Sequence, residues 1–225
     1  MQQTGLNILA ISIFTITLSV LLGPLINLSP FIPATITFVL LGLVTIDTLN
    51  WQNQGINLLV DIFASAEQKE RIIFHEAGHF LTAHVNQIPI QSYTLSAWET
   101  LTKKNTGSGG VIFDTEFLQE NPQDMREKNL MLERVGVVLM AGIAAEKIFY
   151  ESSQGGEEDK IKFQQIYSQL SDGIVNVAMR QRLAILQATT IIETHQEAYL
   201  KLVELMKQRK TVTECQEFLT TKFSL

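Results

Sequence analysis

Residues 65–85 read SAEQKERIIFHEAGHFLTAHV, and the fold prediction starts from this stretch. Ser65 followed three residues later by Gln68 is a helix-start pattern, because each side chain can bond a backbone N–H that the first turn leaves free. The apolar residues that follow predict one helix ending near Val85. Because His75 and His79 are four residues apart, both imidazoles are expected on one face of that helix.

The pattern His-Glu-x-x-His is typical of a zinc-binding helix in metallopeptidases. Two imidazoles on one face can hold one Zn²⁺, while Glu76, next to the first, can act as general base on the water at the metal. The chain has only four His, so a chance match is expected in about 0.5% of sequences of this composition. The competing interpretation is a pair of structural helix histidines.

A catalytic zinc site also needs a third protein ligand and an open fourth position. His84 lies five residues after His79, roughly 140° round the helix, so it should point elsewhere and serve as a surface or packing residue. His195 falls in a polar, helix-like stretch and is expected to be solvated. The acidic group Glu157-Glu158-Asp159 and Glu146 remain as candidates.

Two further motifs follow the first one along the chain. They are Ala141-Gly142-Ile143-Ala144-Ala145-Glu146 and Gly155-Gly156-Glu157-Glu158-Asp159. In order and spacing, the three motifs resemble the peptidase domain of the FtsH family of membrane-bound zinc proteases, over about residues 65–218. The resemblance implies that His75, His79 and Asp159 bind Zn²⁺ and that Glu76 is the base.

The N-terminal region has a different composition from the rest. Asp47 is the first of 17 Lys and Arg and 23 Asp and Glu residues. Two apolar stretches, about 6–22 and 31–48, each approach the roughly 20 residues that a helix needs to cross a bilayer. They predict a transmembrane hairpin, with Trp51 as an interfacial anchor or a core residue. The alternatives are a cleaved signal peptide, which fits poorly without an N-terminal positive charge, and a buried hairpin.

Three parts are therefore expected: a transmembrane hairpin over residues 1–50, a linker over 51–64, and a zinc metallopeptidase-like domain over 65–225. The fold class is mainly α with a small β-hairpin. No Lys or Arg precedes Lys69, so the positive-inside rule gives little guidance on orientation. We expect an integral membrane protein whose peptidase domain lies on the cytoplasmic or plastid stromal side.

Composition excludes several other classes of protein. With one Cys, Cys215, the chain has neither an internal disulfide nor a multi-cysteine zinc site. A net charge of −6 without a long basic cluster argues against nucleic-acid binding. The FtsH family has an ATPase module between its second span and its peptidase. Here that place holds only about residues 50–64, and the sequence has no Gly-x-x-x-x-Gly-Lys-Ser/Thr loop, so no ATP binding is expected.

The rest of the domain predicts a compact helical body. Short strands are expected at 92–96 and 110–113, joined by a polar loop over 98–109. Asn121-Pro122 predicts the start of a helix that continues to about Tyr150. Small residues in that helix allow close packing on the zinc helix, and its Glu146 either bonds a ligating His or forms a surface ion pair with Lys147. Apolar residues at helical spacing from 173 onward predict closing helices.

Two functions are consistent with these features. The first is an ATP-independent zinc metalloendopeptidase, anchored in the bilayer, that cleaves unfolded or exposed polypeptide segments. For this function the resemblance implies that an edge strand near Gly109-Gly110 pairs with extended substrate. The alternative for this segment is an ordinary surface hairpin. The second function is a non-catalytic membrane subunit that binds or regulates full-length FtsH-type proteases or other membrane complexes. Expected partners include polypeptide substrates and either a homo-oligomer or an FtsH-type ATPase.

Overall fold

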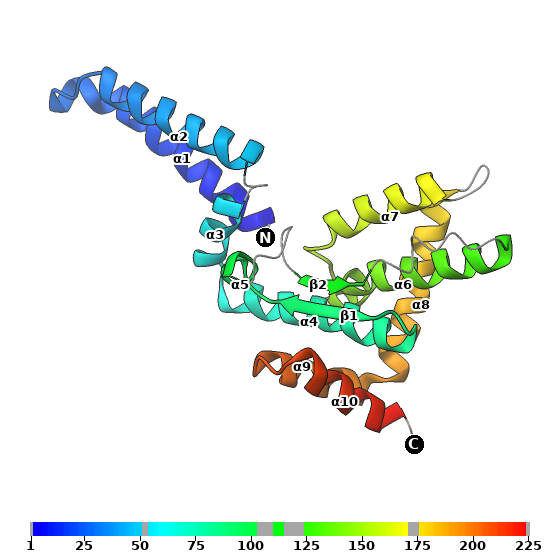
Figure 1. Cartoon of the computed structure of the whole chain (residues 1–225). Helices are drawn as coiled ribbons and strands as arrows, with labels where there is room; N and C mark the ends of the chain where they lie inside the picture. The colour runs from blue at the N-terminus through cyan, green and yellow to red at the C-terminus, as the bar shows by residue number, and fades with distance from the viewer. Residues whose placement is uncertain (1, 51–53, 103–109, 115–123, 171–175, 224–225) are drawn as a thin grey trace. The chain divides into compact units, whose positions relative to one another are not determined.

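The computed structural model of the 225-residue chain describes residues 2–50, 54–102, 110–114, 124–170 and 176–223 (Figure 1). In this described part the protein is mainly helical with one two-stranded sheet, as predicted. The chain divides into two compact units. The first unit is Met1–Ala66 with Ser96–Gly109, and the second unit is Glu67–Leu95 with Gly110–Leu225.

Two long apolar helices dominate the first unit. Helix α1, Gln2–Leu22, leads through the 3-10 turn η1, Gly23–Ile26, to helix α2, Phe31–Asn50. The stretches Leu9–Ile26 and Phe31–Leu49 have mean hydropathies of 2.3 and 1.9, and both are long and apolar enough to cross a membrane. Their side chains are largely exposed, which is the opposite of a core helix in a soluble protein.

Two short helices complete the first unit. The segment predicted as a linker contains helix α3, Gln54–Ile62, while Trp51 lies outside the described residues. The first part of the predicted 98–109 loop is also helical, as α5, Ala97–Thr102, and the remainder of that loop is outside the described residues. Helix α5 packs against α3. This segment between the strands therefore belongs to the first unit.

The second unit begins with α4, Ala66–Val85, which agrees with the predicted helix. Strand β1, Ile90–Thr94, starts two residues earlier than predicted, and β2 is Gly110–Phe113 as predicted. The strands are antiparallel with Tyr93 opposite Val111, and the register shifts between Ile90 and Ser92. The sheet thus brings the start of β2 beside the end of β1.

Helix α6, Met125–Tyr150, is the central element of the second unit. The Asp124 side chain accepts a hydrogen bond from the backbone N–H of Arg126 and caps the helix, whereas the predicted start at Asn121-Pro122 lies outside the described residues. Every residue from 135 to 146 is buried. A helix buried on all sides must be surrounded, and α7, Glu157–Leu170, and α8, Val177–Thr194, both pack on it.

Helices α9, Gln196–Lys207, and α10, Val212–Phe223, are the predicted closing helices. Tyr199, Leu202 and Val203 are buried as their spacing predicts, although Leu200 is largely exposed. The expectation that His195 is solvated was wrong. It lies half-buried at the junction of α8 and α9, with its ring centroid 4.5 Å from that of Phe223. His84 packs against the same phenylalanine at 5.5 Å, as a packing residue should.

Candidate metal centre

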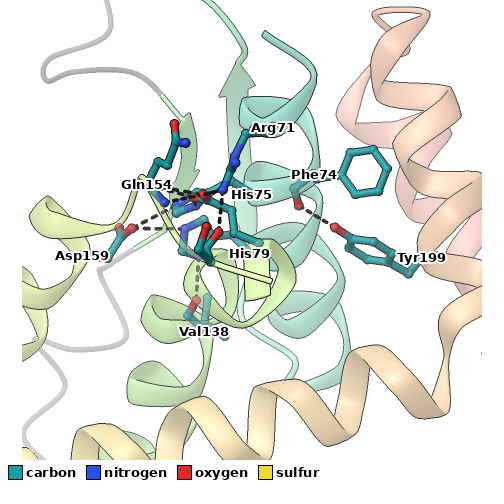
Figure 2. Close-up of polar contacts among 11 residues, drawn as sticks. Arg71, Phe74, His75, His79, Val138, Gln154, Asp159 and Tyr199 are labelled. Atoms are coloured by element: carbon teal, nitrogen blue, oxygen red, sulfur yellow. Dashed lines mark hydrogen bonds and ion pairs between the residues drawn. The ribbon is translucent and has the colours of Figure 1, made fainter. Parts of the chain in front are cut away.

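Helices α4 and α7 bring three predicted ligands together (Figure 2). The Nε2 atom of His75 lies 3.1 Å from Oδ2 of Asp159, and Nε2 of His79 lies 3.5 Å from the same oxygen. The potential ligand atoms all lie within 4.8 Å of one another. Two imidazoles and a carboxylate at this separation can hold a metal ion, so the predicted set converges at one point.

The other nitrogen of each imidazole is hydrogen-bonded. Nδ1 of His79 lies 2.7 Å from the carbonyl oxygen of Val138. A carbonyl only accepts, so this Nδ1 carries a proton, and Nε2 is the nitrogen that faces Asp159. Nδ1 of His75 lies 2.8 Å from Oε1 of Glu146. Partners of this kind fix the ring orientation and the tautomer of a metal-binding histidine.

Glu146 is buried, with 3% of its side chain exposed. Of the two alternatives for Glu146, the surface ion pair with Lys147 is therefore wrong, and the hydrogen bond to His75 is present. The carboxylate also accepts hydrogen bonds from the backbone N–H groups of Gln154 at 2.7 Å and Gly155 at 3.1 Å. It binds the Nδ1 side of His75, away from Asp159, so Asp159 is the acid that belongs to the group able to hold a metal ion.

Arg71 is a residue of the site that the sequence analysis missed. Its guanidinium lies 3.3 Å from Oε2 of Glu146, donates to the carbonyl of Ser152, and stands 4.6 Å over the ring of Tyr150. Arg71 is 7% exposed. The sequence feature that could have identified Arg71 is its position four residues before His75, on the same face of the helix.

Glycines permit the close crossing of α4 and α6. A Cβ at Gly142 would lie 2.2 Å from Nε2 of His75, and a Cβ at Gly78 would lie 2.7 Å from the carbonyl oxygen of Ala141. Any side chain at either position would separate the helices or displace the imidazole. The predicted close packing through small residues is confirmed at both points.

The turn before α7 delivers Asp159. Gly156 has a φ of 86°, and a Cβ there would lie 2.3 Å from a side-chain carbon of Ile143. A Cβ at Gly155 would lie 2.7 Å from Oε1 of Glu146. The two glycines let the backbone pass over α6 closely enough for the Glu146 carboxylate to bind it. Asp159 then follows in the first turn of α7.

Glu76 faces the start of β2. Its Oε2 accepts a hydrogen bond from the backbone N–H of Val111 at 2.8 Å. Gly110 has a φ of 99°, and a Cβ there would lie 2.9 Å from the same carboxylate oxygen. The carboxylate is also close enough for its charge to act on His75. Glu76 therefore lies between the ligand helix and a strand edge.

The three groups of the cluster perturb one another's protonation. Burial acts to lower the pKa of His75, but hydrogen bonds to Asp159 and Glu146 outweigh it and raise that pKa to about 10. Burial acts to raise the pKa of Asp159, yet the two imidazoles hold it well below its ordinary value. The site thus keeps the ionised carboxylate of Asp159 between the two histidines. A bound cation would take the place of the proton that lies between this carboxylate and an imidazole.

No protein-family model matches the chain, and no curated protein sequence matches it.

Proposed function

We propose that the chain is a membrane-anchored zinc metalloendopeptidase of the kind that its motifs resemble, the FtsH peptidase. The observation that carries the proposal is the convergence of His75, His79 and Asp159, with Glu76 on the same helix as the two histidines. Two structural histidines would not require a carboxylate from a separate helix between them.

The donor set fits zinc. Tetrahedral Zn²⁺ with bonds of about 2.0–2.1 Å places its ligand atoms about 3.3 Å apart. The two Nε2 atoms lie 3.1 and 3.5 Å from Oδ2 of Asp159, on either side of that value. Three protein ligands leave one position open, as in catalytic rather than structural zinc sites.

A bound Zn²⁺ supplies Lewis acidity and lowers the pKa of a coordinated water towards neutrality. In this proposal Glu76 accepts a proton from water and returns it to the leaving amine. Its carboxylate is held by the backbone N–H of Val111, which fixes its direction. Glu146 and Val138 keep the two imidazoles in the orientation that presents Nε2.

The sheet offers a place for an extended substrate. Within the described part of the chain, β2 pairs only with β1. A polypeptide can add to an open strand edge through main-chain hydrogen bonds, and such a strand would pass the Glu76 carboxylate. With no phosphate-binding loop in the sequence, the substrates proposed are unfolded or exposed segments rather than folded domains.

The deciding experiment compares purified full-length protein with Glu76→Gln on an unfolded polypeptide. Loss of the base is expected to lower the cleavage rate at least about 100-fold, while both proteins retain about one Zn²⁺ per chain. Glu67→Gln, in the exposed first turn of the same helix, is the matched control and should cleave normally.

Equal cleavage by the wild type and Glu76→Gln would end the proteolytic proposal. An inert wild-type protein that binds Zn²⁺ and co-purifies with a full-length FtsH-type ATPase would instead support the regulatory-subunit alternative.

A further inference from the structure

The first unit exposes apolar side chains outside its two long helices. On and just after α3 they are Leu59, Ile62 and Phe63, and on α5 they are Trp98 and Leu101. Ile62 is 70% exposed, Phe63 66% and Trp98 62%. These five residues are called the α3–α5 surface below. Large apolar side chains grouped in this way mark an interaction site on a protein surface.

Spacing gives each helix one apolar side. Leu59, Ile62 and Phe63 stand at i, i+3 and i+4, and Trp98 and Leu101 stand at i and i+3, so each set lies on one face. The two helices pack against each other (Figure 1). Val60 of α3 is buried, so this helix has both a packed and an unpacked side.

A hydrogen-bonded cap joins α3 to the end of α2. The buried side chain of Asp47 accepts hydrogen bonds from the backbone N–H of Gly55 at 2.8 Å and of Ile56 at 2.9 Å. A Cβ at Gly55 would lie 2.9 Å from that carboxylate, so the contact requires glycine. The second membrane-length stretch ends at Leu49. The start of α3 is therefore held where the hydrocarbon layer would end.

The residues of the α3–α5 surface carry no charge. Residues 1–66 contain no Lys or Arg, and the charged residues of α3 and α5 are Asp61 and Glu99. Lys103 and Lys104 follow α5 in the sequence and lie outside the described residues. A surface of apolar side chains that continues directly from a spanning helix matches the boundary between headgroups and acyl chains, which takes up apolar and Trp side chains.

We propose that the α3–α5 surface docks on the lipid bilayer, with its apolar side chains at the headgroup–acyl boundary. The inference rests on the membrane anchoring in the proposed function.

The test measures the depth of Trp98 in full-length protein carrying Trp51→Phe, reconstituted into phosphatidylcholine vesicles. Lipids brominated near the headgroup end of the acyl chain should quench Trp98 more strongly than lipids brominated near the chain end. The reference is a protein that also lacks Trp98 and carries Lys201→Trp, at an exposed position of α9. Aqueous iodide should quench Trp98 several-fold less than it quenches this reference Trp.

A third probe separates this inference from the anchoring on which it rests. Phe38→Trp, in the middle of the second apolar stretch and 79% exposed, should be quenched most by bromines near the chain end. If that probe is quenched and Trp98 responds only to iodide, the α3–α5 surface faces water and the proposal fails while the anchor stands. If Trp98 is shielded from iodide and from brominated lipid alike, protein covers the surface and the proposal also fails. If Phe38→Trp escapes lipid quenching, anchoring and docking both fail.

Discussion

Each imidazole of the candidate metal centre is held through the nitrogen that does not face Asp159. For His79 the partner is a main-chain carbonyl, whereas for His75 it is the carboxylate of Glu146, itself bound by Arg71 and two backbone N–H groups. A charged partner makes the stronger hydrogen bond and increases the basicity of the imidazole. The two histidines therefore depend on different neighbours.

That difference gives a prediction for Glu146→Gln. The variant keeps the size of the side chain but removes the charge that acts on His75 and leaves Arg71 without its buried partner. Zinc affinity is expected to fall about 10–100-fold, as measured by competition with a chromophoric chelator. Glu133→Gln on the same helix, which loses only an exposed ion pair with Arg180, should bind Zn²⁺ as the wild type does. Equal affinities for the two variants would refute the role assigned to Glu146.

Gly110 is a second position where one added side-chain carbon is expected to disturb the site. Its φ of 99° and the 2.9 Å approach of a Cβ to the Glu76 carboxylate both oppose a side chain. Gly110→Ala is expected to cost about 1–2 kcal/mol of stability and to reduce kcat with zinc still bound, because Glu76 must move. Ile112→Val, two residues along the strand, should keep normal kcat. Unchanged kcat in a folded Gly110→Ala protein would contradict the positioning of Glu76 by β2.

Among the elements, α4 and α6 together form most of the candidate metal centre. Helix α4 carries both histidines, but α6 supplies the carbonyl, the carboxylate and the glycine that allow the rings to lie where they do. The helices approach so closely that the metal centre is built partly from the backbone of α6. A substitution that disturbs the packing of α4 on α6 where they cross should therefore also disturb the candidate metal site.

Two glycines of α6 separate packing from metal binding. A Cβ at Gly142 would lie 2.2 Å from Nε2 of His75, while a Cβ at Gly136 would lie 2.9 Å from ring atoms of Phe163 and from the hydroxyl of Tyr167. Each Ala substitution overpacks the core and should cost about 1–3 kcal/mol in denaturant unfolding. Only Gly142→Ala is expected to lose zinc affinity. Retention of wild-type affinity by Gly142→Ala would show that α6 does not shape the site.

At the scale of the whole second unit, the candidate metal centre connects α4 to α7 across α6. The proposed ligands His75 and Asp159 are 84 positions apart in sequence, so a bound ion would cross-link the folded chain. An ion that binds only the native state stabilises it by about 2.7 kcal/mol when its free concentration is 100 times its Kd. Removal of the metal should thus lower the melting temperature of the second unit.

The pH dependence of that stability has a defined sign. In metal-free protein the pKa of His75 rises from 6.5 to about 10. A group with a raised pKa in the folded state contributes stability that is complete below pH 6.5 and is lost as pH rises through about 10. The melting temperature of chelator-treated protein should therefore fall over this range. Zinc-loaded protein should fall less, because the metal replaces the proton. If the melting temperatures of the two forms fell equally with rising pH, this prediction would be contradicted.

The sequence by itself determined the local parts of this protein. Helix α4 and the end of α6 at Tyr150 follow from periodicity and start patterns within each segment. The two apolar helices follow from an uncharged run of 46 residues before Asp47. The spacing of His75 and His79 placed them on one face, because helical geometry is the same in every context.

Only the tertiary structure decided which acid meets those histidines. Glu146 and Asp159 were both candidates in the sequence, and packing places them on opposite nitrogens of His75. It also buries Arg71 beside Glu146 and assigns the segment containing α5 to the first unit rather than to the sheet it connects. These contacts join residues far apart in the chain, and their choice depends on the fit of whole helices, which no local pattern records.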